Sequence, residues 1–276
     1  MKVAVLGYGT VGAGVYSMLS DAPGMEAGPV LVRPGKAVES FMVSDAALIF
    51  GDPTVDAVVE TLGGLDPAYS YGMRALEAGK HFITANKAMV AAHGLELAAL
   101  AREKGAAFLF SAACGGGVPF LHNLALSAET DRIEAVSGIL NGTTNYMLDA
   151  MQRRSLSYGD ALREAQSLGY AESDPTADVS GLDALRKMQL ACAVAFGVLP
   201  QSGMLCEGME HFTAADVEDI QSRGLVCRLR ARGSRAGESV SAYVEPVLFP
   251  RAAPESSVFT NNNMARYTGK RCGSIV

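Results

Sequence analysis

The sequence predicts an α/β protein with a Rossmann-like, doubly wound parallel sheet, followed by a mixed α+β region. Through the first third of the chain, short apolar runs alternate with segments of helical spacing. The first apolar run ends in a glycine-rich turn, residues 7–12, that opens a helix. A second glycine-rich stretch at 113–120 ends the alternation. We therefore expect a dinucleotide-binding domain over residues 1–115 and a substrate-binding and dimerisation domain over residues 116–276.

The predicted elements follow from apolar periodicity and from helix-terminating residues. The helix expected at 67–79 opens on proline and closes on glycine, the usual asymmetry of a helix. In the first domain we expect strands at 2–7, 28–33, 55–64, 80–87 and 106–113, and helices at 11–20, 67–79 and 92–105. In the second we expect helices at about 144–155, 158–168, 180–197 and 213–222, and strands at 224–233 and 239–249.

Composition excludes several classes of function. A formal net charge of −6 without a basic run disfavours a nucleic-acid partner. The N-terminus lacks a signal-peptide pattern, and no apolar stretch approaches the roughly 20 residues of a membrane span. Five cysteines without a CxxC pair favour neither a disulfide framework nor a zinc ribbon. We expect a cytoplasmic enzyme or binding protein with a small-molecule ligand.

The first glycine-rich turn predicts a dinucleotide site. Gly7, Gly9 and Gly12 form the GxGxxG pattern, which lets the backbone approach a pyrophosphate at a helix N-terminus. NAD-selective sites usually carry an acidic residue about 20 residues further on. Here Arg33 and Lys36 occupy that place, which favours the 2′-phosphate of NADP. A solvated basic loop is the alternative interpretation.

Two further segments follow predicted strands, at the sheet edge where open parallel sheets bind ligands. They are "ETLGG" at 60–64 and "TANKA" at 84–88. We expect Lys87 to face the cofactor crevice, the alternative being an exposed loop lysine.

The stretch "GYAESDPTADVSGLDALRK" at 169–187 gathers carboxylates ahead of one lysine and an apolar helix. Asp183 and Lys187 lie four residues apart and therefore on one helix face. An ammonium entering an apolar interior can act as a general acid and base. Glu172 and Asp178 are placed to receive a substrate ammonium. An exposed salt bridge is the alternative.

A second polar segment, "GILNGTTNYML" at 138–148, is consistent with an Asn-Gly hairpin turn or with a helix start. In the second case Thr143 or Thr144 would cap the helix, and its free amides would face an anion. The four histidines show no metal-ligand spacing, and neither GxSxG nor a P-loop pattern occurs.

Four segments together resemble the homoserine dehydrogenases: "VLGYGTVGAGV", "TANKAMVAAHG", "GILNGTTNYML" and "LGYAESDPTADVSGLDALRK". The resemblance covers most of residues 1–200. It implies reversible, NAD(P)-dependent oxidation of L-homoserine to L-aspartate 4-semialdehyde, in threonine and methionine biosynthesis, by a homodimer. It further implies that Lys187 is the general acid/base, that Asp183 orients it, and that Glu172 and Asp178 bind homoserine. Lys87 would lie between cofactor and substrate.

The same resemblance implies the remaining ligand contacts. The dinucleotide would contact Gly9, Thr10, Val11 and Gly12, with Thr61 and Gly63 beside it. A sodium-like ion would be held by the backbone carbonyls of Ser111, Cys114, Gly116 and Val118. Ser111 stands where the family usually has a glutamate.

Two departures from the family pattern give further expectations. We expect no threonine-sensing regulatory domain. The end of the chain, "TGKRCGSIV" at 268–276, resembles the strand before a glycine-rich loop that returns to the cofactor domain. The rival hypothesis is therefore a shortened, catalytically weak relative that binds nucleotide or serves as a structural subunit.

Overall fold

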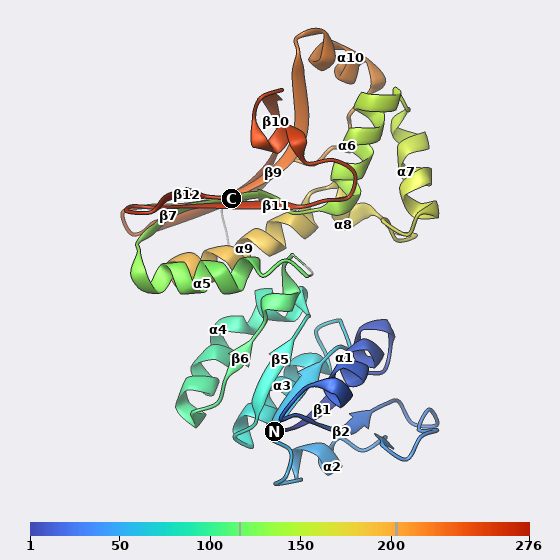
Figure 1. Cartoon of the computed structure of the whole chain (residues 1–276), viewed down its shortest axis with the longest axis vertical. Coiled ribbons are helices and arrows are strands. Elements are labelled where there is room, and N and C mark those ends of the chain that lie inside the picture. Colours follow the sequence, from blue (N-terminus) through green and yellow to red (C-terminus); the bar gives the residue numbers. More distant parts are fainter. Residues whose placement is uncertain (116, 202–203) are drawn as a thin grey trace. The chain divides into compact units, whose positions relative to one another are not determined.

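A computed structural model of the chain describes residues 1–115, 117–201 and 204–276. It divides into two compact units, Met1–Gly117 and Val118–Val276. Figure 1 shows a sheet with flanking helices in each unit. The two units are described separately below.

The first unit contains a six-stranded parallel sheet. Its order is β3-β2-β1-β4-β5-β6, so the chain moves outward from β1, returns to the centre and continues to the other side. This confirms the predicted Rossmann-like, doubly wound arrangement. The strands are β1 (Lys2–Leu6), β2 (Glu26–Leu31), β3 (Met42–Val43), β4 (Ala57–Glu60), β5 (His81–Thr84) and β6 (Phe108–Leu109).

Helices follow β1, β3, β4 and β5 of this sheet and form the connections between its parallel strands. They are α1 (Thr10–Asp21), α2 (Ala47–Phe50), α3 (Ala68–Glu77) and α4 (Lys87–Lys104). Every residue of β1 after Lys2 is buried, because both faces of a parallel sheet are covered. Leu19 of α1 packs with Val3, Val5 and Val30 in the core. Burial of such side chains is the main stabilising contribution.

Several elements of this unit differ from the sequence prediction. Strand β3 and helix α2 are absent from it, and the strands expected at 55–64 and 80–87 are shorter, at Ala57–Glu60 and His81–Thr84. Helix α4 begins at Lys87 rather than at residue 92, because the Asn86 side chain accepts a hydrogen bond from the Met89 backbone N–H and caps the helix. The strand expected at 106–113 is shortened to Phe108–Leu109, and a 3₁₀ turn, η1, covers Ser111–Ala113. Of the expected strand, only Phe108 and Leu109 pair with β5.

The second unit is built on a mixed six-stranded sheet, which confirms the predicted α+β character. Its order is β12-β11-β7-β9-β10-β8, and every described pair is antiparallel except β8 with β10. The strands are β7 (Ile133–Ile139), β8 (Leu205–Cys206), β9 (Leu225–Ala236), β10 (Ser239–Pro250), β11 (Met264–Gly269) and β12 (Gly273–Ile275).

One long helix, α9, packs across β7, β9 and β10, with α5 beside it (Figure 1). A side chain at Gly233 of β9 would collide with Cys192, so glycine permits close contact between helix and sheet. The helices are α5 (Phe120–Thr130), α6 (Gly142–Arg154), α7 (Tyr158–Ser167), α8 (Thr176–Val179), α9 (Leu182–Phe196) and α10 (Ala214–Ser222), with a 3₁₀ turn η2 at Pro254–Ser257.

In the second unit, two further elements differ from the sequence prediction. The helix expected at 180–197 begins at Leu182, and a short separate helix, α8, precedes it, because Gly181 adopts a positive φ of 83° between them. The strand expected at 268–276 is a hairpin of β11 and β12. Asp131 accepts hydrogen bonds from the backbone N–H groups of Arg271 and Cys272, which fixes the hairpin turn.

Among the described residues, no helix combines the length and the apolar character that crossing a membrane requires.

Candidate active site

A crevice of about 1050 Å³ lies at the carboxyl edge of the parallel sheet in the first unit. Its walls come from the turn after β1, the loop after β2 and the loop after β4. These elements flank β1 and β4, where the strand order reverses and where open α/β sheets bind ligands. Of the predicted cofactor residues, the crevice is lined by Gly7, Gly9, Arg33, Thr61 and Gly63.

The glycine turn brings the N-terminus of α1 close against β1. Gly7 has a φ of 100°, which disfavours any side chain there. A Cβ at Gly12 would collide with the Gly7 carbonyl, so this glycine lets α1 start close against β1. No side chain in the described chain caps the N-terminus of α1. Its first-turn amides, at Thr10 and Val11, are therefore available to an anion.

The loop after β2 brings positive charge to the crevice. Arg33 and Lys36 both line it and both are exposed. Arg33 makes no ion pair with another described residue. Glu39 also lines this wall, so the crevice holds two cations and one carboxylate at this end.

A buried carboxylate organises the loop after β4. Glu60 is completely buried, and its Oε1 accepts hydrogen bonds from the backbone N–H groups of Leu62, at 2.6 Å, and Gly63, at 3.1 Å. Its Oε2 accepts from Thr84 Oγ1 on the neighbouring strand, at 2.5 Å. The sequence prediction named Thr61 and Gly63 in this loop but missed the residue that holds it.

Lys87 is the first residue of α4 and is half-buried, so it lies at a helix start rather than at the end of the expected strand or in an exposed loop. The preceding residue fixes its position. Asn86 donates from Nδ2 to the Gly64 carbonyl and from its backbone N–H to Thr84 Oγ1. The loops after β4 and β5 are therefore joined by hydrogen bonds at the sheet edge.

The second unit contains the predicted lysine–carboxylate pair. Lys187 Nζ lies 2.7 Å from Asp183 Oδ2, and their side chains are only 14% and 9% exposed. Lys187 also donates to the Leu140 carbonyl at 2.6 Å. Both partners lie on α9, four residues apart as predicted. The exposed salt bridge considered above is excluded by this burial.

Asn141 connects this pair to a second carboxylate, and the sequence prediction missed it. Its Nδ2 donates to Asp183 Oδ2 at 2.9 Å and to Asp178 Oδ1 at 2.7 Å. Its Oδ1 accepts from the Thr144 backbone N–H and caps α6, so the predicted cap at Thr143 or Thr144 is wrong. Thr143 Oγ1 instead faces the Tyr170 carbonyl and Asp178 Oδ2.

Asp178 and Asp183 lie close together, with only the Lys187 ammonium to balance their two negative charges, and this arrangement disfavours the ionised form of Asp178. Burial is the main cause that raises the pKa of Asp178, and the nearby Asp183 charge raises it further. Hydrogen bonds from Asn141 and Thr143 and the Lys187 charge act in the opposite direction and only partly compensate. The cluster is therefore suited to an additional cationic group next to Asp178.

The raised pKa of Asp178 gives a testable pH dependence. A carboxyl group whose pKa is raised by folding stabilises the fold below its ordinary pKa of 3.8, and this stabilisation is lost as the pH rises through the raised value. We therefore expect Asp178→Asn to increase the urea midpoint of unfolding at pH 7. The increase should shrink as the pH is lowered toward 4. A variant less stable than the parent at pH 7 would contradict this interpretation.

Glu172 is not joined to the cluster. Its carboxylate is exposed and makes no hydrogen bond or ion pair with another described residue. Asp178 lies on the short helix α8 rather than on a loop. The geometry thus assembles Lys187, Asp183 and Asp178 and leaves Glu172 at the surface.

The segment expected to hold sodium is described only in part, because Gly116 lies outside the described residues. The Ser111 carbonyl accepts the Cys114 backbone N–H, and the Val118 carbonyl accepts that of Phe120. Each carbonyl retains a second lone pair that a hard cation could use. Within the described residues, no group of three or more His, Cys, Asp or Glu side chains could hold a metal ion.

Comparison with known proteins identifies a related family for each of the two units. The sequence profile of homoserine dehydrogenase matches residues 119–276, and the profile of the homoserine dehydrogenase NAD-binding domain matches residues 7–111. A homoserine dehydrogenase of Lactococcus lactis is 36% identical over 94% of this chain and 64% of its own length. One of Synechocystis is 36% identical over 100% of this chain and 68% of its own.

Solved structures give the same result. The crystal structure of a homoserine dehydrogenase from Thiobacillus denitrificans superposes with a TM-score of 0.91, at 34% identity, over 100% of this chain and 67% of that one. The chain spans about two thirds of the length of the curated relatives it matches. Because the two profiles together match most of its length, the chain belongs to the homoserine dehydrogenase family.

Proposed function

We propose that this protein interconverts L-homoserine and L-aspartate 4-semialdehyde with a nicotinamide cofactor. The observation that carries the proposal is the buried Lys187–Asp183 pair, which places a proton-transferring group beside carboxylates suited to an amino-acid substrate. Family membership supports the same reaction. The substrates, cofactor and partners below are part of this proposal.

In the proposed reaction, Lys187 takes the proton of the C4 hydroxyl during oxidation and returns it to the aldehyde oxygen in the reverse direction. Its Nζ is held by Asp183 Oδ2 and by the Leu140 carbonyl, so little orientation is lost when the proton moves. When bound, the nicotinamide supplies the acceptor for the hydride that leaves C4.

Asp178 is proposed to bind the substrate ammonium, because its carboxylate lacks full compensation within the chain. Glu172 is proposed as the second substrate ligand, on the motif alone, since it is exposed here. Lys87 is proposed to lie between cofactor and substrate, from its place at the start of α4.

The glycine turn is proposed to hold the cofactor pyrophosphate through the backbone of Gly7, Gly9, Thr10, Val11 and Gly12. Thr61 and Gly63 line the same crevice, with Thr61 Oγ1 next to the Gly7 carbonyl. We propose NADP as the preferred cofactor, because two cations line the wall after β2 where an NAD-selective site carries a carboxylate.

Arg33→Ala tests this preference. We expect the dissociation constant for NADPH to rise about tenfold, the effect of losing one charge-assisted hydrogen bond to phosphate, with that for NADH nearly unchanged. Fluorescence titration of the reduced cofactors measures both constants. Equal changes for the two cofactors would show that Arg33 does not contact the 2′-phosphate. Arg102→Ala, at the end of α4 in the same unit, is the control.

A sodium ion is proposed at the backbone carbonyls of Ser111, Cys114, Gly116 and Val118. This rests on the family resemblance and on the affinity of hard cations for carbonyl oxygens. Its role would be to hold this segment in place, and no chemical step depends on it.

We propose a homodimer that forms through the face of the mixed sheet opposite α9. Ser137, Arg232 and Tyr243 are cross-strand neighbours on that face, because Gly233, the next residue of β9, faces α9. Size-exclusion chromatography with light scattering tests the assembly. A cytoplasmic location without a nucleic-acid partner is proposed from the cysteine usage and the net charge of −6.

The reaction is tested by following reduced nicotinamide while the purified chain oxidises L-homoserine, with NADP and NAD compared side by side. Saturable turnover that depends on homoserine supports the enzyme. Cofactor binding without any turnover would instead favour the catalytically weak, nucleotide-binding relative.

A further inference from the structure

A second polar cavity, of about 360 Å³, lies in the second unit between α6, the start of β9 and the η2 segment. It is separate from the Lys187 cluster. Arg153, on its wall, is twelve residues beyond Asn141 along α6, a distance of about 18 Å in a helix. Nothing in the proposed dehydrogenase reaction uses this cavity.

The cavity carries an excess of positive charge. Three arginines, Arg153, Arg228 and Arg251, line it together with one carboxylate, Asp149. Asp149 Oδ1 is shared, lying 3.0 Å from Arg153 Nε and 3.5 Å from Arg228 Nη2. Arg251 makes no ion pair or hydrogen bond through its side chain with another described residue. One carboxylate therefore faces three guanidinium groups.

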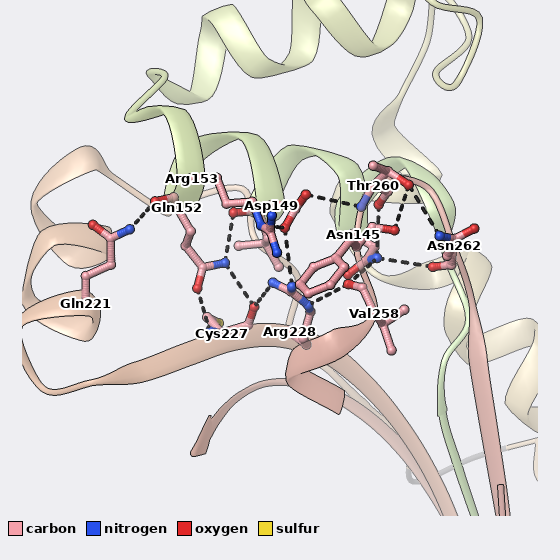
Figure 2. Close-up of polar contacts among 12 residues, drawn as sticks. Asn145, Asp149, Gln152, Arg153, Gln221, Cys227, Arg228, Val258, Thr260 and Asn262 are labelled. Atoms are coloured by element: carbon pink, nitrogen blue, oxygen red, sulfur yellow. Dashed lines mark hydrogen bonds and ion pairs between the residues drawn. The ribbon is translucent and has the colours of Figure 1, made fainter. Parts of the chain in front are cut away.

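The most buried of these arginines is Arg228, at 1% exposure. Figure 2 shows it below α6, between Asp149 and Val258. Its Nε donates to the Val258 carbonyl, Nη1 to the Cys227 carbonyl and Nη2 weakly to Asp149. A guanidinium has five N–H groups, so these three bonds leave two without an acceptor in the described chain. Burial outweighs the Asp149 charge and lowers the Arg228 pKa.

Hydrogen bonds and one cation–π contact join the elements that form the wall of the cavity. Gln152 of α6 exchanges two hydrogen bonds with the backbone of Cys227, where β9 has no strand neighbour on that side. Asn145 Nδ2 donates to three carbonyls of the 258–262 segment (Figure 2). The Arg153 guanidinium stacks 3.8 Å from the Phe259 ring.

We propose that this cavity binds the phosphate group of a small molecule, with Arg228 and Arg251 as its principal ligands. A phosphate group carries a charge of about −1.5 to −2 at neutral pH, which matches the excess of two positive charges. Guanidinium groups present their donors in the planar geometry that phosphate oxygens accept. The hydroxyl groups of Ser256 and Ser257, also on the wall, can complete the set. The volume exceeds that of the ion alone, which leaves room for a phosphate ester.

Isothermal titration calorimetry of the full chain with inorganic phosphate, in chloride buffer of constant ionic strength, tests the site. We expect one saturable site and an affinity about tenfold weaker in R251Q. R132Q removes the same charge from an exposed position outside the cavity and should bind as the parent does. Arg33→Ala should also bind normally, because Arg33 lines the cofactor crevice in the other unit.

Comparison ligands define the chemistry further. Tighter binding of O-phosphoserine than of inorganic phosphate supports the site with an ester as its ligand, and the reverse order supports it with the free ion. Absence of saturable binding, or unchanged affinity in R251Q, would overturn the proposal. So would loss of binding in Arg33→Ala, or malonate binding as tightly as phosphate.

Discussion

Lys187→Ala is expected to lower turnover of L-homoserine by a factor of about 10² to 10⁴, the usual contribution of a general acid/base. The side chain is 14% exposed and is fixed by Asp183 and by the Leu140 carbonyl. No other described lysine lies on α9. The cofactor crevice belongs to the other unit, so NADPH affinity should remain within about twofold of the parent, a change of roughly 0.4 kcal/mol.

The alanine variant also leaves the buried Asp183 carboxylate without its cation, and we expect this to cost about 3–5 kcal/mol of stability. Lys187→Arg separates the two effects. Arginine retains the positive charge beside Asp183 but stays protonated, so it cannot accept the hydroxyl proton. We expect this variant to fold with the parent's thermal midpoint and still to lack turnover. Activity near the parent level in Lys187→Arg would reject the general acid/base role.

The fold of the first unit follows from local sequence signals. The central strand β1 is a nearly continuous apolar run, and the turn after it begins at Gly7, which adopts a positive φ of 100°. The sequence places the start of α4 five residues too late, because the apolar residues Ala88, Met89 and Val90 are compatible with the end of a strand as well as with a helix. The Asn86 cap decides between them, and it depends on side-chain geometry.

The sheet of the second unit could not be predicted to the same extent. β7 and β11 are neighbours although more than 120 residues separate them, and their pairing has no local signature. The end of β11 was read as one strand with β12. The turn between them is fixed by Asp131, which lies 140 residues before Arg271 in the sequence.

The same distinction applies to the active site. Asp183 and Lys187 were predictable because helical spacing alone brings them together. Asn141 was missed because its contacts to Asp178 and Asp183 join segments about 40 residues apart. The one available signal was an Asn directly before Gly-Thr-Thr, a pattern typical of a helix cap. Glu172 is exposed and makes no contact with the cluster, so its role as a substrate ligand stays a prediction from the motif alone.

Glu60→Ala is expected to destabilise the first unit strongly. The Glu60 carboxylate is completely buried and is the acceptor for the backbone N–H groups of Leu62 and Gly63 and for the Thr84 hydroxyl. The buried Thr84 hydroxyl left without its acceptor costs about 1–3 kcal/mol, and the part-buried N–H groups of Leu62 and Gly63 lose less because water can reach them, so we expect a loss of roughly 2–4 kcal/mol in the free energy of unfolding. That is a large share of the roughly 5–15 kcal/mol typical of a folded protein.

The consequence for function should be measurable where the fold survives. Thr61, Leu62 and Gly63 line the cofactor crevice, so releasing their loop should weaken NADPH binding as well as lower the urea midpoint. Glu60→Gln is the sharper variant, since its amide keeps an oxygen for Leu62 and Gly63 but turns a donor toward Thr84. It should lose less stability than Glu60→Ala. Glu77→Ala, at an exposed position of α3, is the matched control. If Glu60→Ala unfolds at the same urea concentration as Glu77→Ala, the buried carboxylate does not hold the loop.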